Sequence, residues 1–165
     1  MFVLDTDVLS NLRKQKKHPA VLRWLQANAA SDLSTTVITI AEIQCGIERQ
    51  KSQDPVYAAD TEHWLDGLLA AGGVQVLALG VAAARLLARM HEAPRLRNFV
   101  VPDPKQKRLK TPADLAVAAI AVAEGAIVAT GNQAHFEEIH ASFPLRGLYN
   151  PFKDVWSVTP VVSRS

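Results

Sequence analysis

Three acidic residues have the types and positions that metal-assisted chemistry requires. Asp5 follows a short apolar run, Glu42 follows a β-branched segment, and Asp114 follows a proline at the start of a helical pattern. Carboxylates near helix N-termini are held ionised by the amide dipoles, and Mg²⁺ prefers ionised oxygen ligands. If the three converge, they repel one another by ~1 kcal/mol or more per pair, and a divalent cation removes that cost. No His and Cys pattern competes for the ion, so we expect Mg²⁺, with Mn²⁺ as a substitute.

Each of these acids also has a purely structural explanation. Asp5 or Asp7 can cap the first helix by accepting a hydrogen bond from its free amides. Two later segments, Thr39–Glu42 and Thr111–Asp114, have the spacing of a capping box, in which a hydroxyl and a carboxylate satisfy each other's backbone amides. Both explanations stay open at this point.

The elements that must position these acids alternate between strands and helices. Apolar and β-branched runs predict strands at residues 2–4, 35–38, 74–77 and 126–129, with a short fifth near 145–148. Helices are expected at residues 8–12, from residue 19, and at 41–50, 55–71, 81–92 and 112–124. The polar, basic, proline-containing residues 94–111 are expected to form a long loop. This order predicts a three-layer α/β/α fold around a four- to five-stranded parallel sheet, with ligands bound beyond the carboxyl ends of the strands.

Composition restricts the class of protein further. The chain has 165 residues, which suits one domain with a substantial core. Its longest apolar run, residues 115–123, is far shorter than the ~20 residues of a membrane helix. No secretory signal is visible, so we expect a cytoplasmic protein with no membrane partner. The single cysteine, Cys45, excludes an intramolecular disulfide and is expected to be a small buried hydrophobe.

The net charge is only +2, but the basic residues are clustered. They lie at residues 13–18 and at 95–110, where they could neutralise phosphates or simply form solvated loops. The candidate phosphate-binding residues are Arg13, Lys14, Lys16, Lys17, Lys107, Arg108 and Lys110.

Five segments, in order along the chain, resemble the motifs of PIN-domain ribonucleases, especially toxins of the VapC and FitB type. They are Leu4-Asp5-Thr6-Asp7-Val8-Leu9-Ser10, Ile38-Thr39-Ile40-Ala41-Glu42-Ile43, Pro112-Ala113-Asp114-Leu115-Ala116-Val117-Ala118-Ala119, Ile127-Val128-Ala129-Thr130-Gly131-Asn132 and Asn150-Pro151-Phe152. The resemblance spans residues 1–152, which we expect to form one PIN-like nuclease domain, and leaves 153–165 as a C-terminal tail.

The resemblance implies roles for individual residues. The expected metal ligands are Asp5, Glu42 and Asp114, and Asn132 takes the position of a fourth acid. The expected supporting residues are Thr6, Asp7, Thr130 and His135. His135 stands where many relatives have an acid, and it could bind a phosphate or lie on the surface. Gly131 stands where an arginine is frequent.

The resemblance also implies a reaction and partners. The expected activity is Mg²⁺-dependent hydrolysis of RNA phosphodiester bonds by the toxin of a toxin–antitoxin pair. The expected partners are the RNA substrate, a cognate antitoxin that blocks the acidic cleft, and a second copy of the chain in a homodimer.

Two other functions compete with this interpretation. A PIN-like domain could bind RNA or a protein partner without cleaving it, which Asn132 and His135 would allow. A haloacid-dehalogenase-like phosphatase would explain Asp5-Thr6-Asp7 and the later Thr130, but the residues after Asn132 contain no Gly-Asp-x-x-Asp sequence for its magnesium site.

Overall fold

The structure is a computed structural model that describes residues 1–14, 16–101 and 112–160. The predicted phosphate-binding residues Lys107, Arg108 and Lys110 lie outside the described residues. No helix within the described ranges is long and apolar enough to cross a membrane.

The centre of the molecule is a six-stranded sheet in the order β3-β2-β1-β4-β5-β6. Five strands are parallel: β1 (Phe2–Leu4), β2 (Leu33–Thr36), β3 (Gln75–Leu77), β4 (Ile127–Ala129) and β5 (Leu148–Asn150). The last strand, β6 (Val155–Val158), pairs with β5 in the antiparallel direction. The segment 153–165, expected to be a tail, therefore contributes a strand to the sheet.

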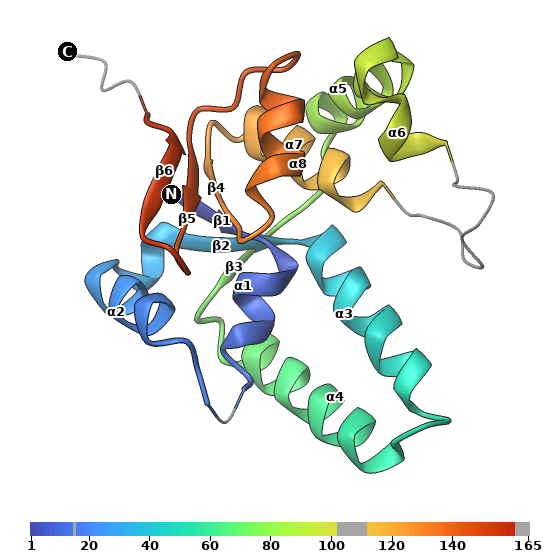
Figure 1. The fold of residues 1–165 in the computed structure, drawn as a ribbon. Coiled ribbons are helices and arrows are strands. Elements are labelled where there is room, and N and C mark those ends of the chain that lie inside the picture. The colour runs from blue at the N-terminus through green and yellow to red at the C-terminus, as the bar shows by residue number, and fades with distance from the viewer. Residues whose placement is uncertain (15, 102–111, 161–165) are drawn as a thin grey trace.

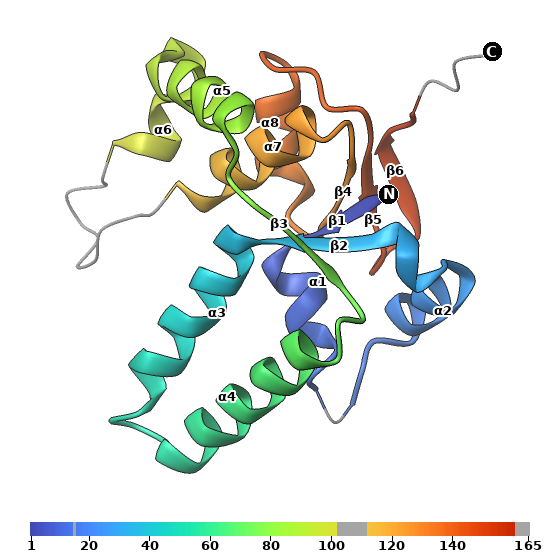
Figure 2. The ribbon, with the colours of Figure 1, turned by 180° about the vertical axis from the view of Figure 1, so that it is seen from behind.

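Helices cover both faces of the sheet, as Figures 1 and 2 show from opposite sides. One face carries α1 (Thr6–Asn11), α2 (Pro19–Ala27), α3 (Val37–Gln50) and α4 (Pro55–Ala70). The other carries α5 (Val81–Glu92), α6 (Arg97–Val100), α7 (Ala113–Ala123) and α8 (Gln133–His140). Two 3₁₀ turns, η1 (Ala30–Asp32) and η2 (Pro94–Leu96), complete the described elements. The predicted three-layer α/β fold is confirmed, with one strand more than expected.

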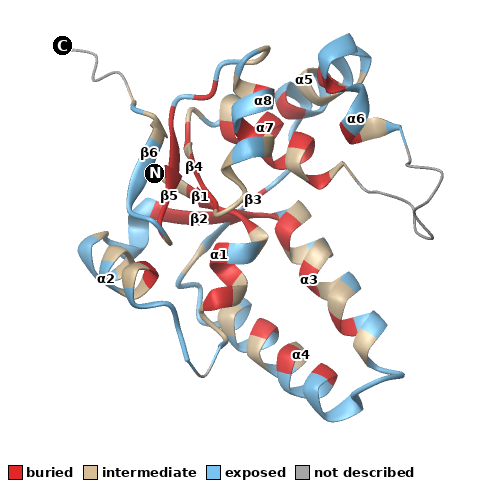
Figure 3. Ribbon diagram, viewed as in Figure 1, coloured by how far each residue is buried: buried red, intermediate tan, exposed pale blue. Residues whose placement is uncertain are grey.

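Each face has its own apolar core. The core under α5 to α8 is dominated by α7, whose alanine-rich sequence lets it pack closely between the sheet and α5. Figure 3 shows the buried residues concentrated in the central strands and in α7. Because one core lies on each face of the sheet, residues at the carboxyl edge of the sheet lie between the two layers of helices.

Several local predictions were wrong, and each has a physical reason. The strand predicted at 35–38 ends at Thr36, because the Thr36 hydroxyl accepts a hydrogen bond from the amide of Thr39 (3.1 Å) and starts α3 at Val37. The predicted loop 94–111 begins with η2 and α6, since apolar side chains within them are buried in the core. Cys45 is exposed rather than buried. Helix α8 and strand β6 were not predicted.

Candidate active site

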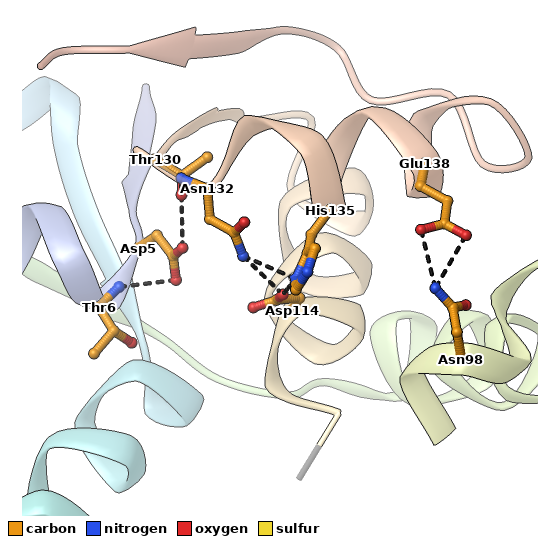
Figure 4. Close-up of polar contacts among 8 residues, drawn as sticks. All are labelled: Asp5, Thr6, Asn98, Asp114, Thr130, Asn132, His135 and Glu138. Carbon is orange, nitrogen blue, oxygen red and sulfur yellow. Dashed lines mark hydrogen bonds and ion pairs between the residues drawn. The ribbon is translucent and has the colours of Figure 1, made fainter. Parts of the chain in front are cut away.

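Asp5 is the first residue beyond β1, and its carboxylate is held on both sides. One oxygen accepts a hydrogen bond from the Thr6 amide and the other from the Thr130 hydroxyl, both at 2.8 Å (Figure 4). The first bond makes Asp5 the N-cap of α1, so the capping explanation holds for this residue. The second bond reaches across to the end of β4, so Asp5 does more than cap its own helix.

Burial makes the ionised form of Asp5 costly. The residue is only 5% exposed, and burial, followed by the negative charge of Asp7, raises its pKa from 3.8 to about 7. The hydrogen bonds from Thr130 and Thr6 oppose this rise, while the charge of Asp114 adds to it. A buried carboxylate with a raised pKa and acidic neighbours is typical of a functional site.

Asp7 lies against the loop that follows β4. Its carboxylate accepts a hydrogen bond from the amide of Gly131 at 2.7 Å. A side chain at Gly131 would place a Cβ atom 2.5 Å from that carboxylate and 3.1 Å from the ring of Phe152. A larger residue at this position must therefore displace the Asp7 carboxylate, which would lose its hydrogen bond in the present position.

Glu42 points toward α1 and does not cap a helix. It is the sixth residue of α3, and its carboxylate accepts a hydrogen bond from the Thr6 hydroxyl at 2.5 Å. The capping box predicted for Thr39–Glu42 is wrong, because Thr36 is the N-cap residue. Burial raises the pKa of Glu42, and the charge of Asp114 contributes to the rise. Thr6 thus contacts two acids, Asp5 through its amide and Glu42 through its hydroxyl.

Asp114 lies in the first turn of α7 and contacts two residues of the β4–α8 region. One of its oxygens lies 2.6 Å from His135 Nδ1 and 3.2 Å from the side-chain nitrogen of Asn132. His135 also stacks edge-on against Phe99, with ring centroids 5.3 Å apart. His135 therefore faces the acid site rather than lying free on the surface. Thr111, the other half of the second predicted capping box, lies outside the described residues.

A continuous chain of hydrogen bonds joins Asp5 to Asp114. The Thr130 hydroxyl donates to Asp5 and accepts from the Asn132 amide at 2.9 Å, and the Asn132 side chain then reaches Asp114. Figure 4 shows Asn132 between the two aspartates. The chain holds Asp5 against Thr130, which lies 125 positions later in the sequence, and places Asn132 against Asp114.

The acids share one electrostatic environment without forming a ready-made metal site. The charge of Asp114 raises the pKa values of Asp5, Asp7 and Glu42. In the described ranges, however, no three Asp, Glu, His or Cys side chains are placed to hold one ion. The donor atoms are the hard oxygens that Mg²⁺ and Mn²⁺ prefer, so the residue types fit such an ion although their present side-chain positions do not yet surround it.

Two cavities lie along α1, α3 and α4, beside the acids. A cavity of about 250 Å³ is lined by Thr6, Ser10, Glu42, Ile43, Gly46, Ile47, Gln50, Tyr57 and Thr61. A second cavity, of about 580 Å³, is lined by Arg13, Lys14, Tyr57, Asp60 and Trp64. Tyr57 lines both cavities, and Arg13 lies over its ring at 4.0 Å. The sequence predicts no active-site residue on α4; its apolar positions Trp64, Leu65, Leu68 and Leu69 hint at a partner surface but favour ordinary core packing.

Comparison with known proteins decides the family. The model of the PIN domain matches residues 2–141, which is most of the chain. This protein belongs to the PIN-domain family.

Three curated relatives agree with that assignment. This PIN domain is 32% identical over 140 residues to the VapC ribonuclease Y4jK of Sinorhizobium fredii and 30% identical over 140 residues to the plasmid stability protein StbB of Pseudomonas syringae pv. tomato. Each match covers 83% of this chain and 91% of the relative. It is also 35% identical to the ribonuclease VapC14 of Mycobacterium tuberculosis over 65 residues, which cover 39% of this chain and 63% of VapC14.

Solved structures show the same fold. The DNA-bound VapBC structure from Salmonella typhimurium matches this PIN domain with a TM-score of 0.66 at 21% identity, covering 91% of this chain and 97% of the other. The VapBC2 structure from Rickettsia felis, bound to a DNA fragment from its promoter, matches with a TM-score of 0.64 at 19% identity, covering 90% and 97%.

Proposed function

We propose that this PIN domain is a Mg²⁺-dependent endoribonuclease, active also with Mn²⁺, and the toxin of a toxin–antitoxin pair. The observation that carries the proposal is the hydrogen-bonded chain from Asp5 through Thr130 and Asn132 to Asp114 at the carboxyl edge of the sheet. Relatives named as VapC ribonucleases support the reaction. Neighbouring structures of VapBC complexes support the pairing with an antitoxin.

The ion would be held by Asp5 and Asp114, with Glu42 bound directly or through water. When bound, it would polarise the scissile phosphate and lower the pKa of a coordinated water. Because no three donors are yet placed around one ion, we expect the Glu42 and Asp114 side chains to rotate inward, while Asp5 is already fixed by two hydrogen bonds.

The supporting residues orient the acids. Thr130 fixes Asp5, while in the metal-free site the Thr6 hydroxyl binds Glu42 and the Asn132 side-chain amide binds Asp114. His135 contacts Asp114 through Nδ1, so its Nε2 can donate to a phosphate oxygen only when both ring nitrogens carry a proton. Asp7 keeps the loop after β4 in place through Gly131.

The basic residues would hold the RNA backbone. Arg13, Lys14, Lys16 and Lys17 lie in or next to the connection between α1 and α2, and all but Arg13 are exposed. They can neutralise phosphates on a single-stranded or loop region, whose bases are free to splay apart. We place the antitoxin segment that blocks the site over the two cavities that share Tyr57, one lined by Arg13 and the other by Glu42.

The test is metal-dependent cleavage of RNA by the purified protein. Wild type should cleave single-stranded RNA in Mg²⁺ or Mn²⁺ and lose the activity in EDTA, and Asp5→Asn should lower the rate by at least about 100-fold. Asp32→Asn is the matched control, because Asp32 precedes β2 at the opposite edge of the sheet and is exposed. Full activity in the Asp5→Asn protein would contradict the assignment.

One observation favours a second function. Since no three donors in the described part of the chain already surround a metal position, a PIN domain that binds RNA or a partner without cutting is the alternative. It predicts unchanged RNA binding in EDTA and no cleavage by wild type under any divalent metal.

A further inference from the structure

A separate pocket with aromatic and charged walls lies between α2 and the β5–β6 end of the sheet. Both ribbon views place α2 beside that end of the sheet (Figures 1 and 2). The pocket has a volume of about 220 Å³ and is lined by Ala20, Arg23, Trp24, Ala27, Tyr149 and Asp154. The four α2 residues are spaced three and four apart, so a single face of this helix forms one wall. We call this feature the α2 pocket.

The aromatic side of the α2 pocket is rigid. Trp24 lies 5.5 Å from Tyr149 and 5.1 Å from Phe2, and Tyr149 lies 4.9 Å from Trp156, measured between ring centroids. Trp24 is half-buried, so part of its ring faces the pocket, whereas Tyr149 is buried. A flat ligand can therefore stack on a preformed surface without ordering a flexible side chain.

The charged groups of the α2 pocket are not paired with each other. Arg23 and Asp154 are both exposed, and no ion pair joins them in the described structure. Asp154 accepts a hydrogen bond from the Tyr149 hydroxyl. Burial, and then that hydrogen bond, raise the pKa of Tyr149 to about 12, so the hydroxyl remains a donor. The Asp154 backbone also adopts a left-handed conformation, φ 58°, which an aspartate tolerates.

We infer that the α2 pocket binds one unpaired base of the RNA strand and prefers guanine. The choice of RNA as the ligand rests on the proposed ribonuclease function. A base can stack on Trp24, as bases do on aromatic side chains of single-strand binding proteins. Asp154 can accept from the two neighbouring N–H groups on the Watson–Crick edge of guanine, which no other standard RNA base presents. Arg23 can pair with the adjoining phosphate.

Size and charge exclude other occupants. The pocket is smaller than the roughly 300–1,000 Å³ of typical small-molecule sites, so it suits a single ring system. A cationic peptide side chain would find Trp24, Tyr149 and Asp154 favourable, but it would have to approach the like charge of Arg23. A nucleotide, which combines a hydrogen-bond donor edge with a phosphate, uses both charges.

The α2 pocket is connected to the acid site through Phe152. This residue lies in the β5–β6 turn, at the same edge of the sheet as Asp5. Its ring lies against Gly131, whose amide binds Asp7, and contacts the ring of His18, with centroids 5.5 Å apart. His18 directly precedes α2. A strand lying across the acids can therefore pass Phe152 and place a neighbouring base in the pocket.

The test is nucleotide binding to metal-free protein. In EDTA, titration with 5′-GMP, AMP, CMP and UMP followed by calorimetry should give tightest binding for GMP. Asp154→Asn should reduce the preference for GMP by roughly tenfold, because it loses the carboxylate but keeps an acceptor for Tyr149. Arg23→Gln should weaken all four nucleotides alike. The matched control is Glu124→Gln, an exposed acid next to α7 at the opposite edge of the sheet.

The binding results separate the base site from the nuclease activity. Equal binding of the four nucleotides, or wild-type binding of GMP by Asp154→Asn, would overturn the inference, as would tighter binding of arginine amide than of GMP. A protein that binds GMP but cleaves no RNA would retain the α2 pocket as a base site and reject the proposed nuclease. A protein that cleaves RNA but does not bind GMP would retain the proposed nuclease and reject the α2 pocket as a base site.

Discussion

Asp5 and Asp114 are both placed at the carboxyl edge of the sheet, yet their surroundings differ. Asp5 is almost fully buried and is held by the amide of Thr6, at the start of α1, and by the hydroxyl of Thr130, directly after β4. The Asp114 side chain is 24% exposed and is held by two side chains, those of His135 and Asn132.

This difference in burial gives Asp5 and Asp114 different roles in the site. The fixed and desolvated Asp5 carries an electrostatic penalty when it is ionised, so a cation placed there relieves the penalty. The partly exposed Asp114 can rotate with little loss of packing, so it can adjust to an ion and a phosphate. The following predictions test whether stability depends on Asp5 while chemistry depends on both.

The largest effect should be the dependence of stability on pH in the metal-free protein. The folded-state pKa of Asp5 is raised to about 7, so the folded protein keeps a proton that the unfolded chain has released. The contribution of Asp5 to the free energy of unfolding is therefore greatest below about pH 4. It falls by on the order of 4 kcal/mol as the pH rises to about pH 7. Asp5→Asn should flatten this fall, measured by urea unfolding in EDTA at about pH 4 and about pH 8.

Asp32→Asn, an exposed acid outside the site, is the control and should keep the wild-type slope. An unchanged slope in Asp5→Asn would show that Asp5 is already ionised at little cost. Burial would then not distinguish Asp5 from Asp114.

The second largest effect should come from Thr130→Val. The Thr130 hydroxyl is fully buried and serves both Asp5 and the amide of Asn132. Its loss leaves buried polar groups unsatisfied, so the free energy of unfolding should fall by about 1–3 kcal/mol. RNA cleavage should fall by roughly 10- to 100-fold, as for other residues that orient metal ligands. Thr130→Ser keeps the hydroxyl and should recover most of the activity in the same cleavage assay.

A smaller effect on stability should follow Asp114→Asn. The amide keeps the size of the side chain, and the residue is partly exposed, so the free energy of unfolding should change by less than about 1 kcal/mol. Cleavage should nevertheless fall as far as in Asp5→Asn. Thermal unfolding and RNA cleavage measured on the same preparation test both halves of this statement. A large loss of stability would mean that Asp114 mainly supports the fold.

The smallest effect should follow the double change Lys16→Gln and Lys17→Gln. Both residues are exposed, so the fold should not respond. If they contact the backbone of a single strand, the slope of log affinity against log salt should fall by about 0.7 for each charge removed. Binding of labelled RNA to Asp5→Asn protein over a series of salt concentrations measures it. Glu124→Gln, which removes an exposed charge next to α7, should leave the slope unchanged.

Much of the architecture could be predicted because its signals are local. The strands at residues 2–4 and 126–129 are short apolar runs, and the helix at 81–92 has a regular apolar stripe, so each was found to within a residue. Helix α8 was missed because only Phe136 and Ile139 are buried in its eight residues. Strand β6 was missed because its residues are exposed or half-buried and no apolar alternation marks it.

The residues of the candidate site could be predicted from the sequence, but the contacts between them could not. The acids and their order along the chain were visible in the motifs. The placement of Asn132 between Asp5 and Asp114, and of His135 on Asp114, depends on side-chain orientations across α7, β4 and α8. The α2 pocket could not be predicted either, because Trp24 and Asp154 are distant in sequence and meet only where α2 packs beside the β5–β6 turn.

The antiparallel β6 also shields the hydrogen-bonding groups of β5. A chain shortened after residue 152, where the family motifs end, would leave the β5 backbone as an open edge beside an uncovered aromatic cluster. Such edges recruit strands from other molecules. Expression of the shortened chain should therefore give inclusion bodies or soluble oligomers, and purification tags are better attached beyond residue 160 than within the last strand.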